Sequence, residues 1–378
     1  MNQPKKNILA IVSYPFLPAT TGGEISTLNI LNYMAIPHNV TVFTVEPYNQ
    51  NFKSESLNFK LIAGMKFSFW RYLNVFIVFK LLRLIKSKNI DLIFFDQPFM
   101  GWMMPFLKVF SNKKKFLRSN NIEYLRFKSM GKIWWKLMYC YEKFTYRSAD
   151  LVIFVSDVDR QKAILEFGLN EQKTLLTPYG IELTEIPIKI EESRKNIEEK
   201  YSIKSDEMIL LFFATMSYQP NYEAVEFIAE KIYPILKTQS AFDFKILICG
   251  KNLPEFVKQK ISNKSEIVYC GFVDDINTYI DACDVMINPI LSGGGVKTKA
   301  IDTLARNKIV ISTTTGAEGI DPTICGSKLV VTPDLDWQAF VESIIENRNK
   351  NEKIPESFYE TYSWTNIIKN LTIQLEKL

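Results

Sequence analysis

The chain of 378 residues contains a single histidine, His38, and five cysteines, none of them in a Cys-x-x-Cys pair. A zinc site made of two or three histidines therefore cannot form, and a Ser-His-Asp triad would have to use His38. His38 stands directly before an apolar run that begins at Asn39, at the entrance of an expected strand, and this position favours a structural role. The scattered cysteines indicate reduced, mostly buried thiols in a reducing compartment.

Long apolar runs are also missing. No stretch of about 20 apolar residues without charge is present, so no segment is expected to span a bilayer. Residues 1–6 are polar and the apolar run 7–12 is short, which predicts a first strand rather than a signal peptide. There is no short-period repeat and no low-complexity tract. The length of 378 residues predicts about two domains. Hydrophobic residues make up 47% of the chain, with 27 Phe, 17 Tyr and 6 Trp, which is enough for large cores.

The net charge of +5 hides an asymmetry along the chain. Residues 1–180 hold 24 Lys and Arg against 12 Asp and Glu, a balance of 24 − 12 = +12, while the remainder holds 22 against 29, or −7. The range 66–147 alone holds 17 cations against 4 acids, or +13. A basic half joined to an acidic half indicates that the first half faces an anionic partner.

Two stretches of this basic region combine cations with bulky apolar residues. The range 66–88 is compatible with one long helix rich in Phe, Trp and Leu, and the range 124–147 has the same character. Such helices can lie in a membrane interface; alternatively, they pack on a sheet with their charges in solvent. Nucleic-acid binding is disfavoured, because the cations are mixed with bulky apolar residues and no nucleic-acid-binding motif is present.

The pattern of apolar runs predicts two parallel α/β sheets in series. Runs in the first half end in polar residues, which are expected at the carboxyl edge of the sheet, where ligands enter such folds. A polar, charged segment follows a boundary near residues 178–187, and a second α/β series begins after it. The predicted strands are 7–13, 41–45, 91–95, 115–118 and 151–155 in the first half, and 208–213, 244–248, 266–270, 284–288 and 308–313 in the second.

One loop of the second half favours anion binding. Gly293, Gly294 and Gly295 follow a buried run, and a helical pattern then continues to about residue 306. Free backbone N–H groups and the positive end of a helix dipole converge in such a loop. Lys297 and Lys299 are expected in the first helical turn, where the dipole disfavours cations unless an anion is bound. The alternative is a glycine turn with two solvated lysines, since glycine loops are weak signals.

The order of motifs resembles a known family. The second half contains, in sequence, Cys270-Gly-Phe-Val-Asp-Asp-Ile276, Ala282-Cys-Asp-Val-Met-Ile-Asn-Pro289, Ser292-Gly-Gly-Gly-Val-Lys-Thr-Lys-Ala-Ile-Asp302, Lys308-Ile-Val-Ile-Ser-Thr313 and Gly316-Ala-Glu-Gly-Ile320. This set resembles the nucleotide-sugar half of glycosyltransferase family 4 enzymes of the GT-B fold. The ranges 13–23, 118–123, 141–156 and 177–181 resemble parts of the other half of those enzymes.

The resemblance implies a fold and an activity. The fold is α/β GT-B, with two Rossmann-like parallel-sheet domains facing a central cleft. Residues 1–182 would bind the acceptor, residues 183–361 would bind the nucleotide sugar, and a C-terminal helix, 362–378, would cross back to the first domain. The activity is that of a retaining, metal-independent glycosyltransferase without a further cofactor. It would move a sugar from a UDP- or GDP-sugar to a lipid-linked or cell-surface polysaccharide acceptor, at the cytoplasmic face of the membrane.

The same resemblance implies roles for individual residues. Lys297, Lys299 and the backbone N–H groups of Gly294 and Gly295 would neutralise the diphosphate. The backbone at Phe272 and Val273 would line the nucleobase pocket, Asp302 would hold the ribose, and Gly22 and Gly23 would close over the diphosphate. The implied catalytic residues are Lys297, Asn120 and Asp302, and no residue is expected to bind a metal.

Several residues depart from the family pattern, and these departures leave other functions open. Gly294 and Asp302 stand where two glutamates are usual, Lys297 stands where arginine is common, and Asn120 stands where histidine is usual. Lysine keeps the charge but lacks the bidentate fork of arginine. The chain could therefore be a catalytically weak GT-B protein that serves as a nucleotide-sugar-binding partner subunit. An inverting or phosphorylase-type relative is a further alternative, because fold does not determine chemistry.

Overall fold

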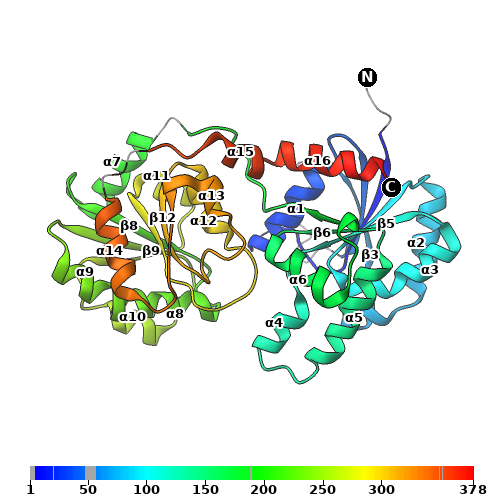
Figure 1. Cartoon of the computed structure of the whole chain (residues 1–378), viewed down its shortest axis with the longest axis horizontal. Helices are drawn as coiled ribbons and strands as arrows, with labels where there is room; N and C mark the ends of the chain where they lie inside the picture. Colours follow the sequence, from blue (N-terminus) through cyan, green and yellow to red (C-terminus); the bar gives the residue numbers. More distant parts are fainter. Residues whose placement is uncertain (1–4, 20, 47–56, 188–189, 349, 351) are drawn as a thin grey trace. The chain divides into compact units, whose positions relative to one another are not determined.

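The computed structural model describes residues 5–19, 21–46, 57–187, 190–348, 350 and 352–378. The chain divides into two compact units, Met1–Gly180 together with Tyr362–Leu378, and Ile181–Thr361 (Figure 1). Each unit contains one sheet of parallel strands with helices on both of its faces. The α/β fold class with two parallel sheets is therefore confirmed.

The first unit is built on a seven-stranded sheet with the order β3-β2-β1-β4-β5-β6-β7. The order reverses between β1 and β4, and ligands of such sheets bind at the carboxyl ends of strands beside this reversal. The strands are β1 (Asn7–Val12), β2 (Asn39–Val45), β3 (Lys60–Met65), β4 (Leu92–Asp96), β5 (Lys114–Ser119), β6 (Leu151–Phe154) and β7 (Thr174–Leu176).

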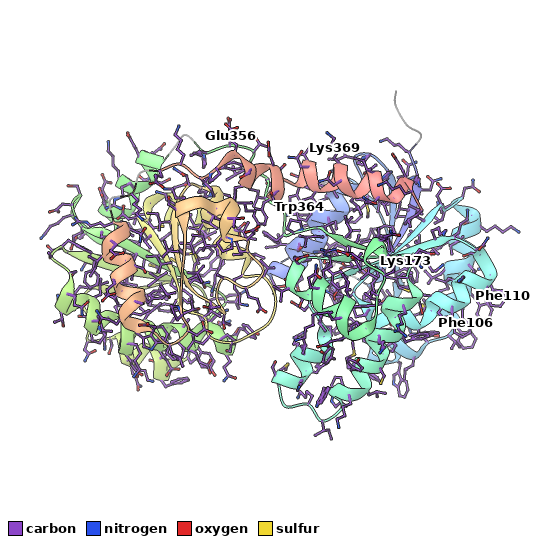
Figure 2. All side chains as sticks on the ribbon, viewed as in Figure 1. Phe106, Phe110, Lys173, Glu356, Trp364 and Lys369 are labelled. Atoms are coloured by element: carbon purple, nitrogen blue, oxygen red, sulfur yellow. The ribbon has the colours of Figure 1, made fainter. Side chains whose placement is uncertain are left out.

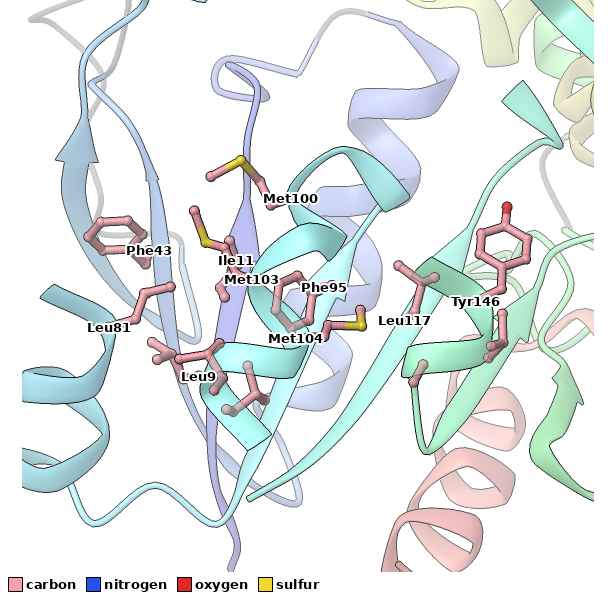
Figure 3. Packing of buried hydrophobic residues seen from close by; sticks show 14 of the residues in the cluster. Leu9, Ile11, Phe43, Leu81, Phe95, Met100, Met103, Met104, Leu117 and Tyr146 are labelled. Atoms are coloured by element: carbon pink, nitrogen blue, oxygen red, sulfur yellow. The ribbon is translucent and has the colours of Figure 1, made fainter. Parts of the chain in front are cut away.

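Successive side chains of β1 enter different cores, because side chains alternate along a strand. Leu9 and Ile11 join a cluster beneath helices α2 to α6, as Figure 3 shows for part of this packing. Ile8 and Ala10 join the cluster on the opposite face, beneath α1 and α16. The helices are α1 (Gly22–Met34), α2 (Phe76–Ser87), α3 (Met104–Ser111), α4 (Glu123–Ser129), α5 (Trp135–Ser148), α6 (Asp157–Phe167) and α16 (Trp364–Glu376), with short 3-10 helices η2 (Phe69–Leu73), η3 (Pro98–Met103) and η4 (Glu171–Lys173).

Helix α16 returns the C-terminal segment to the first unit, as the sequence predicts. Trp364 is buried at its start and stacks on Tyr33 of α1, with ring centroids 5.7 Å apart. A Cβ at Gly180 would lie 2.3 Å from the indole of Trp364, so glycine is required there. His38 contacts the same helix through Nε2, which lies 3.3 Å from Thr372 Oγ1, in keeping with a structural role.

The second unit is built on a six-stranded sheet with the order β10-β9-β8-β11-β12-β13, which reverses between β8 and β11. Its strands are β8 (Met208–Phe213), β9 (Phe244–Cys249), β10 (Ile267–Gly271), β11 (Val285–Asn288), β12 (Ile309–Thr313) and β13 (Leu329–Thr332). Its helices are α7 (Ile190–Tyr201), α8 (Gln219–Phe227), α9 (Tyr233–Gln239), α10 (Glu255–Ile261), α11 (Ile276–Ala282), α12 (Thr298–Ala305), α13 (Pro322–Cys325), α14 (Trp337–Asn347) and α15 (Glu356–Tyr362), with a π-helix η5 (Ile228–Ile232) and a 3-10 helix η6 (Gly326–Lys328).

Two local predictions need correction. The range 66–88 is not one helix: η2 comes first, and α2 begins only at Phe76, where the Asn74 side chain accepts the backbone N–H of Phe76 at 3.0 Å. Strands β3, β7 and β13 were not predicted from the pattern. All three lie at sheet edges, and the half-exposed residues of edge strands do not form the continuous apolar runs of interior strands.

Candidate functional site

The predicted glycine loop lies at the carboxyl end of β11, beside the reversal of strand order in the second sheet. Gly293 and Gly295 have φ angles of +87° and +79°, which residues with a side chain rarely adopt. A Cβ on Gly293 would also lie 2.8 Å from the hydroxyl of Tyr218. Gly294 has no positive φ, and a Cβ on it would meet open space. The missing acid at Gly294 is therefore not a steric requirement of this loop.

Lys297 ends the loop rather than beginning the helix. It is the N-cap of α12, which starts at Thr298, so its predicted place in the first helical turn is wrong by one position. Its Nζ donates to the carbonyl oxygens of Gly293 at 2.8 Å and Gly295 at 2.7 Å. These two hydrogen bonds hold the ammonium group of Lys297 against the loop, next to the N-terminus of α12.

Lys299 lies in the first turn of α12, as predicted, and is half-buried. Its Nζ lies 4.4 Å from the ring centroid of Phe212, at the end of β8, and 3.4 Å from Oδ1 of Asn221 in α8. Burial, and secondarily repulsion from Lys297, lowers the pKa of Lys299 to about 7. Among the described residues no carboxylate forms an ion pair with Lys299. The fold thus keeps two cations close together at a helix N-terminus, where an anion would stabilise both.

Asp302 lies one turn further along α12 and is half-buried. Burial raises the pKa of its carboxyl group to about 7, against the opposing effect of Arg306. The Arg306 guanidinium itself binds Asp281, with Nη1 at 2.8 and 2.7 Å from the two carboxylate oxygens. Within the described part of the chain the carboxylate of Asp302 makes no hydrogen bond, so it is available to accept hydroxyl groups of a ligand.

Phe272 and Val273 follow β10, at the same edge of the second sheet. Gly271 before them has a φ of +68°, and this turn leaves the Phe272 ring 69% exposed while Val273 packs against the core. Strands β9 and β8 separate β10 from β11. No hydrogen bond or ring contact of the described residues joins this pair to Lys297, Lys299 or Asp302.

The remaining predicted residues, Gly22, Gly23 and Asn120, belong to the first unit. Gly22 and Gly23 open helix α1 behind the N-cap Thr21, which forms a capping box with Glu24. Residue 20 of the resembling loop lies outside the described residues. Asn120 follows β5, and its buried Oδ1 accepts no hydrogen bond from the described residues. Asn120 therefore lies at the carboxyl edge of the first sheet, where polar residues also follow the neighbouring strands.

A buried ionic cluster beside Asn120 was not identified as a unit from the sequence. Arg118 Nη1 lies 3.2 Å from Asp96 Oδ1, and both side chains are almost fully buried. Asp96 also accepts from Thr27 Oγ1 at 2.8 Å and from the hydroxyl of Tyr14, whose pKa rises well above its usual value through burial and the nearby carboxylate. The signal was present, since Asp96 and Arg118 each end an apolar run, but their pairing depends on the adjacency of β4 and β5.

Neither metal ligation nor membrane crossing is indicated by the described residues. Among them no three His, Cys, Asp or Glu side chains are grouped so that they could hold a metal ion. No helix in this part of the chain is both long enough and apolar enough to cross a bilayer.

Solved structures of similar fold identify the fold class of this chain. A glycosyltransferase from Rickettsia africae superposes with a TM-score of 0.72 at 19% identity, over 99% of each chain. An Anabaena protein solved in complex with UDP-glucose superposes with a TM-score of 0.72 at 14% identity, over 98% of this chain and 100% of that one. The fold is therefore the GT-B fold, as the sequence predicts.

Family models identify the chain within this class. One described as glycosyl transferases group 1 matches residues 207–348, and one described as glycosyltransferase family 4 matches residues 20–185. The chain belongs to these glycosyltransferases. It is also 26% identical over 241 residues to an uncharacterised 44.6 kDa protein of the cps region of Klebsiella pneumoniae, which is 59% of this chain and 57% of that relative. The chain thus spans less than two thirds of that relative's length.

Proposed function

We propose that this chain is a retaining glycosyltransferase. It moves a sugar from a nucleotide-diphosphate-sugar donor, most simply a UDP- or GDP-sugar, to a lipid-linked or cell-surface polysaccharide acceptor, without a metal ion. The observation that carries the proposal is the pair Lys297 and Lys299 at the N-terminus of α12 behind a glycine loop. The relative in a cps region and the neighbour solved with UDP-glucose agree with this acceptor and donor class.

The donor site is proposed around α12. A diphosphate concentrates negative charge, which the two ammonium groups and the N–H groups of Gly294 and Gly295 would neutralise. Asp302 would accept the ribose hydroxyls, since its carboxylate makes no hydrogen bond with the described residues. Phe272 and Val273 would line the nucleobase pocket, and Gly22 and Gly23 would approach the diphosphate from the first unit.

The chemistry follows from stabilising the leaving group. When the bond between the sugar and the diphosphate breaks, negative charge grows on the leaving phosphate oxygen. Fixed cations at that position lower the barrier, because they are already oriented before the charge develops. The departing phosphate oxygen can take the proton of the acceptor hydroxyl, so no strong base is required where Asn120 replaces the usual histidine. In this scheme Lys297 acts on the leaving group, while Asp302 and Asn120 orient donor and acceptor.

A second function is favoured by two specific residues. Asn120 and Gly294 lack the side chains that the family usually has at these positions, so the chain could bind a nucleotide sugar as a partner subunit and turn it over poorly. Single-turnover hydrolysis of the matching nucleotide sugar separates the two functions. An Asn120→His variant that gains activity while donor binding stays the same would favour the weak-enzyme reading of the native chain.

We place the protein at the inner face of the cell membrane, as a peripheral protein, and not on nucleic acid. The ranges 66–88 and 124–147 would contact anionic lipid, as the sequence predicts. This location would bring the enzyme to a lipid-linked acceptor.

A thermal-shift panel of UDP, GDP, TDP, ADP and CMP tests the donor site, because a ligand that binds only the native state raises the apparent stability. We expect one clear stabiliser, whose effect is lost in Lys297→Ala and Lys299→Ala. Lys258→Ala is the matched control, since this half-exposed lysine on α10 forms, among the described residues, an ion pair with Glu255 alone. A panel without any stabiliser, or equal loss in the control, contradicts the proposed site.

A further inference from the structure

The helical layer over one face of the first sheet exposes many large apolar side chains. Helix α2 packs on α3, α3 packs on α5, and α5 packs on α4, so their outer sides belong to one layer. Figure 2 shows Phe106 and Phe110 projecting from the outer side of α3. The exposed large apolar residues of helices α2 to α5 and of the segments that lead into them are Phe67, Phe69, Trp70, Leu73, Val75, Phe76, Phe79, Phe106, Val109, Phe110, Met130, Ile133, Trp134, Leu137 and Phe144. A surface of this size on one face indicates an interaction site.

The turn between α4 and α5 carries the most exposed large apolar side chain of this surface, Ile133. We call the segment 130–137 the hairpin tip. Ile133 is 92% exposed and Leu137 is 72% exposed, while Met130 and Trp134 lie beside them and are about half exposed. Gly131, with a φ of +68°, makes the turn. It is the grouping of such exposed apolar side chains at one turn that is typical of an interaction site, since single exposed apolar residues are common on protein surfaces.

Cations are interleaved with these residues. Lys132 and Lys136 lie within the hairpin tip, and Lys128 stands one turn before it. All three are exposed, and the ammonium groups of Lys128 and Lys136 lie 4.9 and 5.8 Å from the ring centroid of Trp135. The ammonium groups of Lys128 and Lys136 therefore lie beside the indole of Trp135 at the exposed surface of the chain.

The acids of the same region do not offset this charge. Asp96, Glu123 and Glu142 are buried. Glu142 accepts the backbone N–H groups of Glu123 and Tyr124 at 2.8 and 2.7 Å, and burial raises its pKa to about 8. Within residues 66–147 the one exposed acid is Asp91, which accepts the N–H of Asn7 at the entrance of the sheet. The outer surface is therefore cationic as well as apolar.

We propose that the hairpin tip inserts into an anionic lipid bilayer. Ile133, Trp134 and Leu137 would enter the boundary of the acyl chains, and Lys132 and Lys136 would bind the lipid phosphates. Lysine alternating with bulky apolar residues favours lipid over a protein partner or a second copy, because lysine is depleted in the cores of protein interfaces. Insertion of the hairpin tip rests on the membrane location given under the proposed function.

Co-sedimentation with phosphatidylcholine vesicles, with and without an equal share of phosphatidylglycerol, tests the insertion. The full chain is expected to bind the mixed vesicles at least about tenfold more tightly, with affinity falling as salt rises. The double variant Ile133→Ser with Leu137→Ser should lose about tenfold or more in affinity. Leu165→Ser is the matched control, because Leu165 is 82% exposed on α6 of the same unit.

Four results would overturn the inference. The double variant could bind the mixed vesicles as the native chain does, or the control could lose as much. Binding could be equal on neutral vesicles and insensitive to salt. Sedimentation velocity without lipid could show a dimer that the double variant dissociates, which would make a second copy the occupant. The nucleotide thermal shift of the double variant is expected to be unchanged, so failure of the donor site and failure of insertion are seen in different assays.

Discussion

Lys299 provides the sharpest prediction, because its burial couples nucleotide binding to pH. In the free protein the pKa of Lys299 is lowered to about 7 by burial and by Lys297. A bound diphosphate should return the pKa toward the ordinary value of about 10.4. The complex therefore holds a proton that the free protein has lost above pH 7. Affinity for the nucleoside diphosphate must then fall as pH rises.

The size of the effect follows from the two pKa values. If the bound pKa lies between about 8.5 and 10.4, linkage predicts a loss of affinity of about 10- to 50-fold between pH 7 and pH 9, or about 1.4 to 2.3 kcal/mol. At pH 8 binding should take up about 0.7 to 0.9 proton over the same range of bound pKa values. The phosphates of the ligand are already ionised over most of this range, since their last pKa is about 6.

Isothermal titration calorimetry with the stabilising nucleotide measures both the affinity and the number of protons taken up, if two buffers of different ionisation enthalpy are used at each pH. Lys299→Arg is the informative variant, because arginine stays charged throughout this range, and its affinity should be nearly independent of pH. A flat profile for the native chain, or the same slope in Lys299→Arg, would refute the assignment of the proton to Lys299.

The stability of the free protein should rise with pH while its affinity for the nucleotide falls, and this difference provides an internal check. Between pH 7 and about 10 the unfolded chain keeps the Lys299 proton that the folded chain has lost. The unfolded state then binds more protons, so this group makes the free energy of unfolding rise with pH. Urea unfolding at pH 7 and pH 9 should show that the difference between the two pH values shrinks in Lys299→Met.

Three further changes test other parts of the site. Gly295→Ala should cost roughly 1–2 kcal/mol in urea unfolding, because its φ of +79° disfavours a side chain, whereas Gly294→Ala should cost little. Asp302→Asn should weaken binding of the ribonucleoside diphosphate about tenfold and leave the deoxyribonucleotide unaffected; equal losses for both would exclude the ribose contact. Asp96→Ala should destabilise the chain by about 3–5 kcal/mol by leaving Arg118 buried without its carboxylate, and a loss below 1 kcal/mol would contradict the closed cluster.

Much of the fold could be predicted from local pattern. Interior strands such as β8 (Met208–Phe213) are buried nearly throughout, so they appear in the sequence as continuous apolar runs. Glycines before a helical pattern likewise indicated the loop at α12, because the positive φ angles of Gly293 and Gly295 require this residue type. The sequence by itself therefore determined the two-sheet class, the family, and the place where an anion site is proposed.

Tertiary structure decided the partners of these residues. Asn221 and Phe212 lie far from Lys299 in sequence and reach it only because β8 pairs with β11. Asp96 and Arg118 meet for the same kind of reason, through the pairing of β4 with β5. Strand order arises from the whole chain, and local periodicity does not encode it. The lowered pKa of Lys299, and the burial of the acids beneath a cationic outer surface, follow from that order, since both depend on what surrounds a charge in space.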